Sequence, residues 1–144
     1  MNLAKKIQDI RKTSKLSQDK FAEKLFVTRQ AVSRWETGET TPSVETLKKM
    51  LLLFNVDANS LFDLNSVCQS CGRRFESLDD VGTNEDKTVS WDYCTPCFDD
   101  GKFYADCGLE EWVDICLQYL DDQSEEGRKS FREQLLTLKR WNKV

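Results

Sequence analysis

The sequence predicts a mainly α-helical protein in which a cysteine-rich module separates two helical regions. In residues 1–64, five short stretches carry apolar side chains at helical spacing. In residues 68–107, glycines and cysteine pairs replace that spacing, and it returns from residue 109. A chain of 144 residues is long enough for two small domains. We therefore expect one domain at 1–64 and a second at 67–144.

The five N-terminal helices are predicted from apolar faces and from capping residues. The first spans residues 2–13, where Leu3, Ile7 and Ile10 recur at helical spacing. Each later helix follows a side chain that can accept a hydrogen bond from its first turn, and these capping residues are Ser17, Thr28, Ser43 and Asp57. Gly38 is typical of a helix end. Tight turns between short helices predict a compact domain.

The second region is predicted to contain a short strand and, after the cysteines, two helices. Residues 88–91 have the β-branched and aromatic composition of a strand. Apolar residues at helical spacing indicate one helix from Leu109 and another after Ser124, a capping residue. The aromatic side chains of this part are expected to pack in the domain's own core, and they are Trp112, Tyr119, Phe131 and Trp141.

Charge is distributed unevenly along the chain. Residues 1–64 carry 11 lysines and arginines against 8 acidic residues, a net charge of +3. Residues 65–144 carry 10 against 17, a net charge of −7. Only the first domain is therefore expected to approach a polyanion.

Several classes of protein are disfavoured by what the sequence lacks. The chain contains no histidine, which excludes Ser-His-Asp and Cys-His catalysis, and we see no phosphate-binding loop, so we expect no enzyme. It has no run of 18 apolar residues and no apolar stretch typical of a signal peptide at its start. We therefore expect no membrane span and a cytoplasmic protein.

Residues 16–36 contain two short capped helices about three residues apart, with the small Ala22 where the helix axes must approach. This is the arrangement of a helix-turn-helix. Together with Trp35-Glu36-Thr37-Gly38 and Pro42-Ser43, the segment resembles the Cro and phage-repressor family of helix-turn-helix domains over roughly residues 3–64. The resemblance implies a sequence-specific regulator of transcription, for which we expect repression, that binds double-stranded DNA.

The helix that starts after Thr28 carries the residues expected to read DNA. Arginine can pair with guanine and glutamine with adenine, and the N-terminal part of this helix enters the major groove. By the resemblance, base reading is assigned to Arg29, Gln30 and Ser33, and contacts with the DNA backbone are assigned to Gln18, Thr28 and Arg34, with Arg11 as a further candidate. Gln18 also starts a helix, where backbone N–H groups favour a phosphate. The alternative is an ordinary solvated helix face.

The turn between the two helices departs from the family pattern. The family often has glycine where this chain has Phe26. A residue other than glycine in the left-handed region costs roughly 1–2 kcal/mol. We expect either that the turn relaxes or that burial of Phe26 offsets this cost.

Two C-x2-C pairs predict a structural zinc site. Cys68 and Cys71 form the first pair, and Cys94 and Cys97 form the second after 22 intervening residues. Each pair can direct two thiolates at one ion, and two pairs complete the closed tetrahedral shell of structural Zn²⁺. Gly72 suits a turn with positive φ. The alternatives are an iron centre with the same ligands, a thiol–disulfide pair, and cysteines that only pack in the core.

The second half resembles a bacterial zinc-ribbon family from residue 68 to about 140. The segments that carry the resemblance are Cys68–Gly72, Gly82–Asn84, Tyr93–Cys97, Gly101–Phe103, Glu110–Trp112 and Leu138–Trp141. It implies a small zinc-ribbon module followed by two helices, and it names no reaction. For Cys107 and Cys116, which lie outside the pairs, we expect structural roles, with redox sensing by Cys107 as the alternative.

Zn²⁺ with four thiolates carries a formal charge of −2, which adds to the negative charge of the second domain. We therefore expect this domain to serve as a scaffold, a dimerisation unit or a protein contact. Because one helix-turn-helix reads only a short half-site, we expect a homodimer on two half-sites. The alternative is an interaction adaptor or antitoxin-like partner that uses the zinc module and binds DNA only secondarily.

Overall fold

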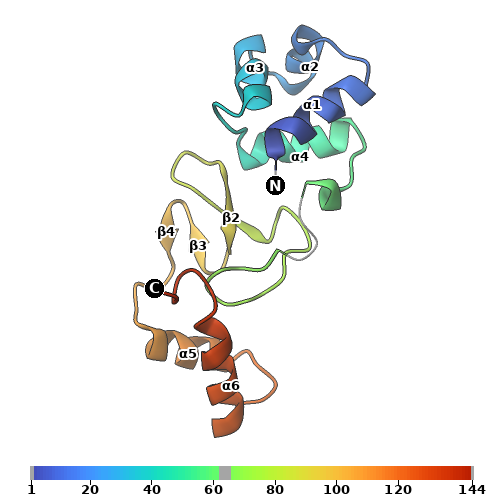
Figure 1. The fold of residues 1–144 in the computed structure, drawn as a ribbon. Coiled ribbons are helices and arrows are strands. Elements are labelled where there is room, and N and C mark those ends of the chain that lie inside the picture. The colour runs from blue at the N-terminus through green and yellow to red at the C-terminus, as the bar shows by residue number, and fades with distance from the viewer. Residues whose placement is uncertain (1, 62–65, 144) are drawn as a thin grey trace.

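A computed structural model describes residues 2–61 and 66–143 of the chain. Figure 1 shows a helical domain at one end, the strands in the middle and two helices at the other end. The elements of the first domain are α1 (Leu3–Thr13), α2 (Gln18–Leu25), α3 (Arg29–Thr37), α4 (Val44–Leu53) and a 3-10 helix, Ala58–Ser60. The predicted domain boundary, between residues 64 and 67, includes residues outside the described part.

The predicted capping residues all start their helices. Ser17, Thr28 and Ser43 precede α2, α3 and α4, and each side chain accepts a hydrogen bond from a backbone N–H three residues later. Asp57 caps the fifth predicted helix, which forms as the single 3-10 turn. α3 ends at Gly38, whose φ of 78° places it in the left-handed region. Local chemistry therefore sets the helix limits in this domain.

The core of the first domain is built from the predicted apolar faces. The fully buried side chains include Ile7 of α1, Phe21 and Leu25 of α2, Val32 of α3, and Leu47 and Met50 of α4. Phe21 also stacks on Phe54, with ring centroids 4.9 Å apart. This packing fixes α2 and α3 against each other and leaves the polar side of α3 outside.

Within residues 66–143, the second region has four short strands and two helices. β1 (Val81–Thr83) pairs antiparallel with β2 (Val89–Cys94), and β3 (Phe98–Asp99) pairs antiparallel with β4 (Lys102–Phe103). The strand predicted at 88–91 is confirmed and continues to Cys94. The two predicted helices are α5 (Leu109–Leu117) and α6 (Glu125–Leu135). The mainly α-helical fold class, with a strand-containing ribbon followed by helices, is therefore confirmed.

One predicted core aromatic lies on the surface instead. Trp112 and Phe131 are buried and Trp141 is half-buried, as expected. Tyr119 is 85% exposed. The prediction was wrong here because α5 ends at Leu117, so Tyr119 lies in the following turn and leaves the apolar helical face.

The two regions contact each other at the N-terminal end of α4. The backbone N–H of Val44 donates to the carbonyl oxygen of Lys87 at 3.1 Å, beside an isolated bridge between Ser43 and Thr88. Lys48 Nζ lies 2.5 Å from Asp79 Oδ1. Figure 1 shows α2 and α3 on the side of the first domain remote from the strands. The ribbon therefore leaves the helix-turn-helix uncovered.

No helix in the described part of the chain is long and apolar enough to cross a membrane.

Candidate DNA interface and zinc centre

The turn between α2 and α3 keeps the left-handed conformation without glycine. Phe26 ends α2 at φ 57° and ψ 42°, and its side chain is 87% exposed. Both sequence expectations for Phe26 were therefore wrong, because the turn has not relaxed and the ring is not buried. The left-handed turn is held by the next residue, because the Val27 N–H donates to Ala22 O at 3.0 Å. The Val27 side chain, and not that of Phe26, is half-buried there.

The structure places the residues predicted to read bases on the outer side of α3. Arg29 and Gln30 are exposed and Ser33 is half-buried, whereas Val32 and Trp35 are buried. Arg29 Nε lies 3.7 Å from Asp19 Oδ2. Exposed ion pairs of this kind contribute little to stability, so the arginine can exchange its carboxylate for another acceptor.

The predicted backbone-contacting residues flank this face. Thr28 is exposed and its Oγ1 accepts from Ala31 N at 3.1 Å, which fixes the start of α3. Arg34 is exposed, with Nε 3.9 Å from Glu39 Oε2. Gln18 begins α2 and is half-buried. The fold thus brings these residues to the two helices of the motif, at the N-terminus of each and along the outside of α3.

Glu36 organises this region from inside, a role that the sequence analysis missed. Its side chain is only 3% exposed and accepts hydrogen bonds from Arg11 Nη2 and Gln18 Nε2, both at 3.0 Å. Burial raises the pKa of the Glu36 carboxyl, but the hydrogen bond from Arg11 and then that from Gln18 outweigh it and hold the pKa below its usual value. Arg11, the further candidate for a contact with the DNA backbone, pairs with Glu36 and also donates to Leu16 O within the domain.

The four paired cysteines converge on one point. Their sulfur atoms all lie within 4.8 Å of one another, and Cys71 Sγ and Cys94 Sγ are 3.7 Å apart. A tetrahedral Zn²⁺ with Zn–S bonds of about 2.3 Å requires sulfurs about 3.8 Å apart. Cys68, Cys94 and Cys97 are buried and Cys71 is half-buried. The residues present therefore fit a closed four-thiolate zinc shell.

Local backbone geometry directs each pair at the shared point. Gly72, at φ 79°, donates its N–H to Cys68 O at 2.8 Å and closes the first turn. Cys97 N donates to Cys94 O at 3.0 Å in the second turn. Cys94 N also donates to Cys68 Sγ at 3.3 Å, a contact that stabilises a thiolate.

Four sulfurs this close need a cation to ionise together. Hydrogen bonding to Cys71, followed by that to Cys94 and Cys97, lowers the pKa of Cys68. The pKa values of Cys94 and Cys97 are raised, first by their interaction with Cys68. Cys68 opposes a lowered pKa at Cys71, but the hydrogen bonds with Cys94 and Cys97 outweigh it, so the pKa of Cys71 is also lowered. Ionisation of Cys94 and Cys97 beside the first thiolates is thus disfavoured, and the charge of Zn²⁺ would remove that penalty.

Comparison with known families agrees with this geometry. Residues 67–142, more than half of the chain, match the family model described as "Putative zinc ribbon domain". The chain belongs to this zinc-ribbon family. The match and the four clustered thiols identify structural Zn²⁺ as the cofactor of the ribbon, in preference to the other cysteine roles that the sequence left open.

The first domain has its own matches. Residues 7–61 match the helix-turn-helix family model, as the resemblance to Cro and phage repressors predicts. Over 61 residues the chain is 38% identical to "HTH-type transcriptional activator BcrR" of Enterococcus faecalis. That stretch covers 42% of this chain and 30% of the relative, so the chain spans less than a third of the relative's length. No solved structure matches the chain.

The C-terminal helices are anchored to the zinc ribbon through Ser70, which lies between the first two ligands. Its carbonyl oxygen accepts from the indole N–H groups of Trp112 and Trp141, at 3.0 and 2.8 Å. Its hydroxyl accepts from Arg140 Nη1 at 2.9 Å. The Arg140 guanidinium also lies 4.0 Å from the ring centroid of Phe103. The segment after α6 is therefore tied to the turn that carries Cys68 and Cys71.

The two remaining cysteines lack the features of reactive thiols. Burial is the largest cause that raises the pKa of Cys107, and it raises the pKa of Cys116 to about 12. Because the thiolate is the reactive form, a raised pKa lowers reactivity at neutral pH. The structural role expected for both cysteines stays a prediction, with redox sensing by Cys107 as the alternative.

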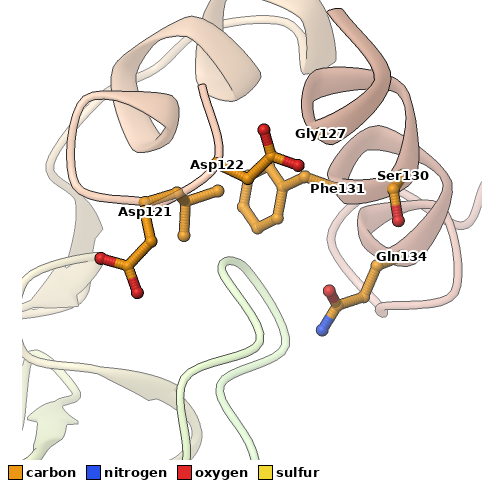
Figure 2. Close-up of a pocket in the computed structure, with 7 residues that line it drawn as sticks. Asp121, Asp122, Gly127, Ser130, Phe131 and Gln134 are labelled. Carbon is orange, nitrogen blue, oxygen red and sulfur yellow. The ribbon is translucent and has the colours of Figure 1, made fainter. Parts of the chain in front are cut away.

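An open cavity of about 290 Å³ lies beside α6. Figure 2 shows Asp121 and Asp122 on the loop before α6, opposite Ser130 and Gln134 on the helix. Asp122 accepts from Ser124 N at 3.0 Å, which ties it to the start of α6.

Proposed function

We propose that this protein is a DNA-binding regulator of transcription that reads operator DNA with α3. The observation that carries the proposal is the exposed polar face of α3, presented by a capped helix-turn-helix and left uncovered by the ribbon. The helix-turn-helix match and the relative named as a transcriptional activator support a regulator and not an enzyme.

Two groups of residues divide the work at the DNA. Arg29, Gln30 and Ser33 read base edges in the major groove, where a bidentate arginine or glutamine discriminates between base pairs. Contacts with the DNA backbone come from Gln18, Thr28 and Arg34. Glu36 accepts a hydrogen bond from the Gln18 side chain and so fixes its position. Gln18 would therefore meet a phosphate from a fixed position at the N-terminus of α2, where backbone N–H groups also favour an anion.

Repression is the proposed outcome of binding. Occupancy of an operator by itself blocks a polymerase, whereas activation requires a further protein contact. The relative from Enterococcus faecalis is named as an activator, so activation is the outcome against which repression must be tested. A promoter–reporter assay with the bound sequence upstream decides the sign, since repression predicts a lower signal when the protein is present.

The proposed active form is a homodimer in the cytoplasm. Two half-sites about one helical turn apart need two copies of α3. Leu52 and Leu53 at the end of α4 are 83% and 54% exposed and offer apolar surface for the second copy. Sedimentation that shows only monomer, with and without DNA, would contradict the dimer.

The zinc ribbon is proposed to act as a scaffold outside the DNA interface. Its negative charge disfavours phosphate, and it contacts α4 through Val44 and Lys48. Figure 1 shows α2 and α3 on the side of the first domain remote from the strands. Folding of the ribbon around Zn²⁺ would therefore fix where the C-terminal helices stand relative to the DNA-binding domain.

The second candidate function is an interaction adaptor or antitoxin-like protein, with DNA binding secondary. The exposed Tyr104 and Tyr119, at 82% and 85%, favour it, because large exposed aromatic side chains are common in protein contacts. A stable partner that copurifies through the second domain, together with DNA binding that lacks sequence preference, would support this candidate over the first.

Selection of bound sequences from a random DNA pool tests the proposed function. The protein with zinc loaded should enrich one sequence with two related half-sites. A pool that stays random after repeated rounds would defeat the proposal. A helical circular dichroism spectrum of the same protein sample would show that such a failure is not due to unfolding.

A further inference from the structure

Phe26 combines backbone strain with exposure. It stands at φ 57° with 87% of its surface exposed, so no burial compensates for the left-handed conformation. Among the described residues, the other positions with positive φ and a side chain are all polar, and they are Lys15, Asn55, Lys87 and Asp100. Packing within the chain therefore gives no reason for an aromatic ring at this position.

The turn itself does not need the ring. Gly38 ends α3 at positive φ, and the polar Lys15 and Asn55 follow α1 and α4 at positive φ, so helix ends in this domain reach the left-handed region without an aromatic ring. The turn after α2 is held by backbone hydrogen bonds from Phe26 N to Glu23 O, at 3.3 Å, and from Val27 N to Ala22 O, at 3.0 Å. Glycine at position 26 could make the same bonds.

The position of the ring points to DNA as its partner. Phe26 lies two residues before Thr28, the cap of α3, and the N-terminal end of this helix enters the major groove in this motif. The neighbouring Lys24 is exposed in the last turn of α2 and adds positive charge. Exposed cations flank the ring in sequence, with Lys24 before it and Arg29 after it, and this continuity with the proposed interface favours nucleic acid over an apolar protein surface.

We propose that Phe26 makes an apolar contact with duplex DNA at the outer edge of the half-site, beside the bases read by Arg29. Duplex DNA offers apolar C–H surface there from two sources, the thymine methyl group and the deoxyribose. The proposal rests on the proposed function, and it adds to the polar face of α3 a residue that the sequence analysis did not assign to DNA.

Two variants separate the contact from the strain. Phe26→Gly removes the ring and suits the left-handed turn, so it should raise the melting temperature by about 4 °C. On the DNA fragment selected by the parent protein, it should bind about tenfold more weakly. Phe26→Tyr keeps the ring and should bind within about twofold of the parent. Gain of stability with loss of affinity is a combination that a purely structural role would not give.

Asn55→Gly is the matched control, because it places glycine at another exposed position of positive φ, after α4. Its affinity should equal that of the parent. Replacing the outer thymines of the fragment by deoxyuridine distinguishes the two sources of apolar C–H surface. Weaker binding of the parent but not of Phe26→Gly supports the methyl group. Unchanged binding of both proteins supports the deoxyribose.

The proposal is overturned if Phe26→Gly binds as tightly as the parent, or if Asn55→Gly loses as much affinity. A parent protein that selects no DNA sequence would defeat the proposed function itself. That outcome is distinct from a parent that binds DNA and a Phe26→Gly variant that binds equally well.

Discussion

Replacement of the buried carboxylate of Glu36 should destabilise the helix-turn-helix domain strongly. Glu36→Gln keeps the shape and one acceptor oxygen but removes the charge that faces Arg11. The Arg11 and Glu36 side chains are only 14% and 3% exposed, so the arginine would lose its counter-charge where water could replace it only in part. Removing one partner of a buried pair costs about 3–5 kcal/mol, and the retained oxygen places the expected loss near the lower value, about 3 kcal/mol.

The assay is native-state hydrogen exchange of α3 amides, which reports unfolding of this domain apart from the ribbon. Glu23→Gln is the matched control, because Glu23 pairs with Lys20 at the surface and is 70% exposed. Its cost should stay below about 1 kcal/mol. If Glu36→Gln costs no more than Glu23→Gln, the buried pair does not stabilise the motif as argued.

The difference in the free energy of unfolding between the parent and Glu36→Gln should depend on pH with a definite sign. The pKa of Glu36 is lowered in the folded state. Its contribution is therefore fully present above the unfolded value, about 4.3, and is lost as pH falls through the folded value. The free-energy difference between the parent and Glu36→Gln should be constant from pH 7 to pH 5 and shrink on further acidification. A difference that grows below pH 4 would contradict this account.

Three further outcomes are expected. Cys94→Ser should lose the bound zinc and unfold residues 67–142, as measured by metal analysis and circular dichroism, and full zinc content with an intact fold would contradict the site. Trp112→Phe removes the indole N–H that donates to Ser70 O at 3.0 Å. It should lower the free energy of unfolding, measured by denaturant titration, by about 1–2 kcal/mol. An unchanged midpoint would show that this hydrogen bond does not stabilise the second domain. Arg34→Ala should weaken anisotropy-measured DNA binding alike for all sequences and reduce the salt slope by about 1, and a change in base preference would instead make Arg34 a base-reading residue.

The parts that sequence predicted well are those that local chemistry determines. The caps at Ser17, Thr28 and Ser43 were found because a capping side chain acts within three residues of its position. The zinc ligands were found because a C-x2-C pair forms a complete half-site by itself. Neither inference needed knowledge of distant parts of the chain.

The parts that sequence missed depend on contacts between distant residues. Arg140 and Ser70 are 70 positions apart, and nothing in either segment signals their hydrogen bond. Arg11 carried a charge that suited DNA, but Glu36, 25 positions away, binds it inside the domain. For Phe26, we expected either a relaxed turn or a buried ring. Both expectations failed because the half-buried Val27 beside it could not be foreseen from spacing.

The central claim is that α3 reads operator DNA, and the most direct measurement compares the sequences that the parent and Arg29→Ala select from one random DNA pool. The account predicts that the parent enriches two related half-sites and that the variant loses preference at one base position, with affinity for the parent sequence reduced by about 1–3 kcal/mol. Loss of affinity spread evenly over all sequences would contradict base reading by Arg29, and failure of the parent to enrich any sequence would contradict the claim as a whole.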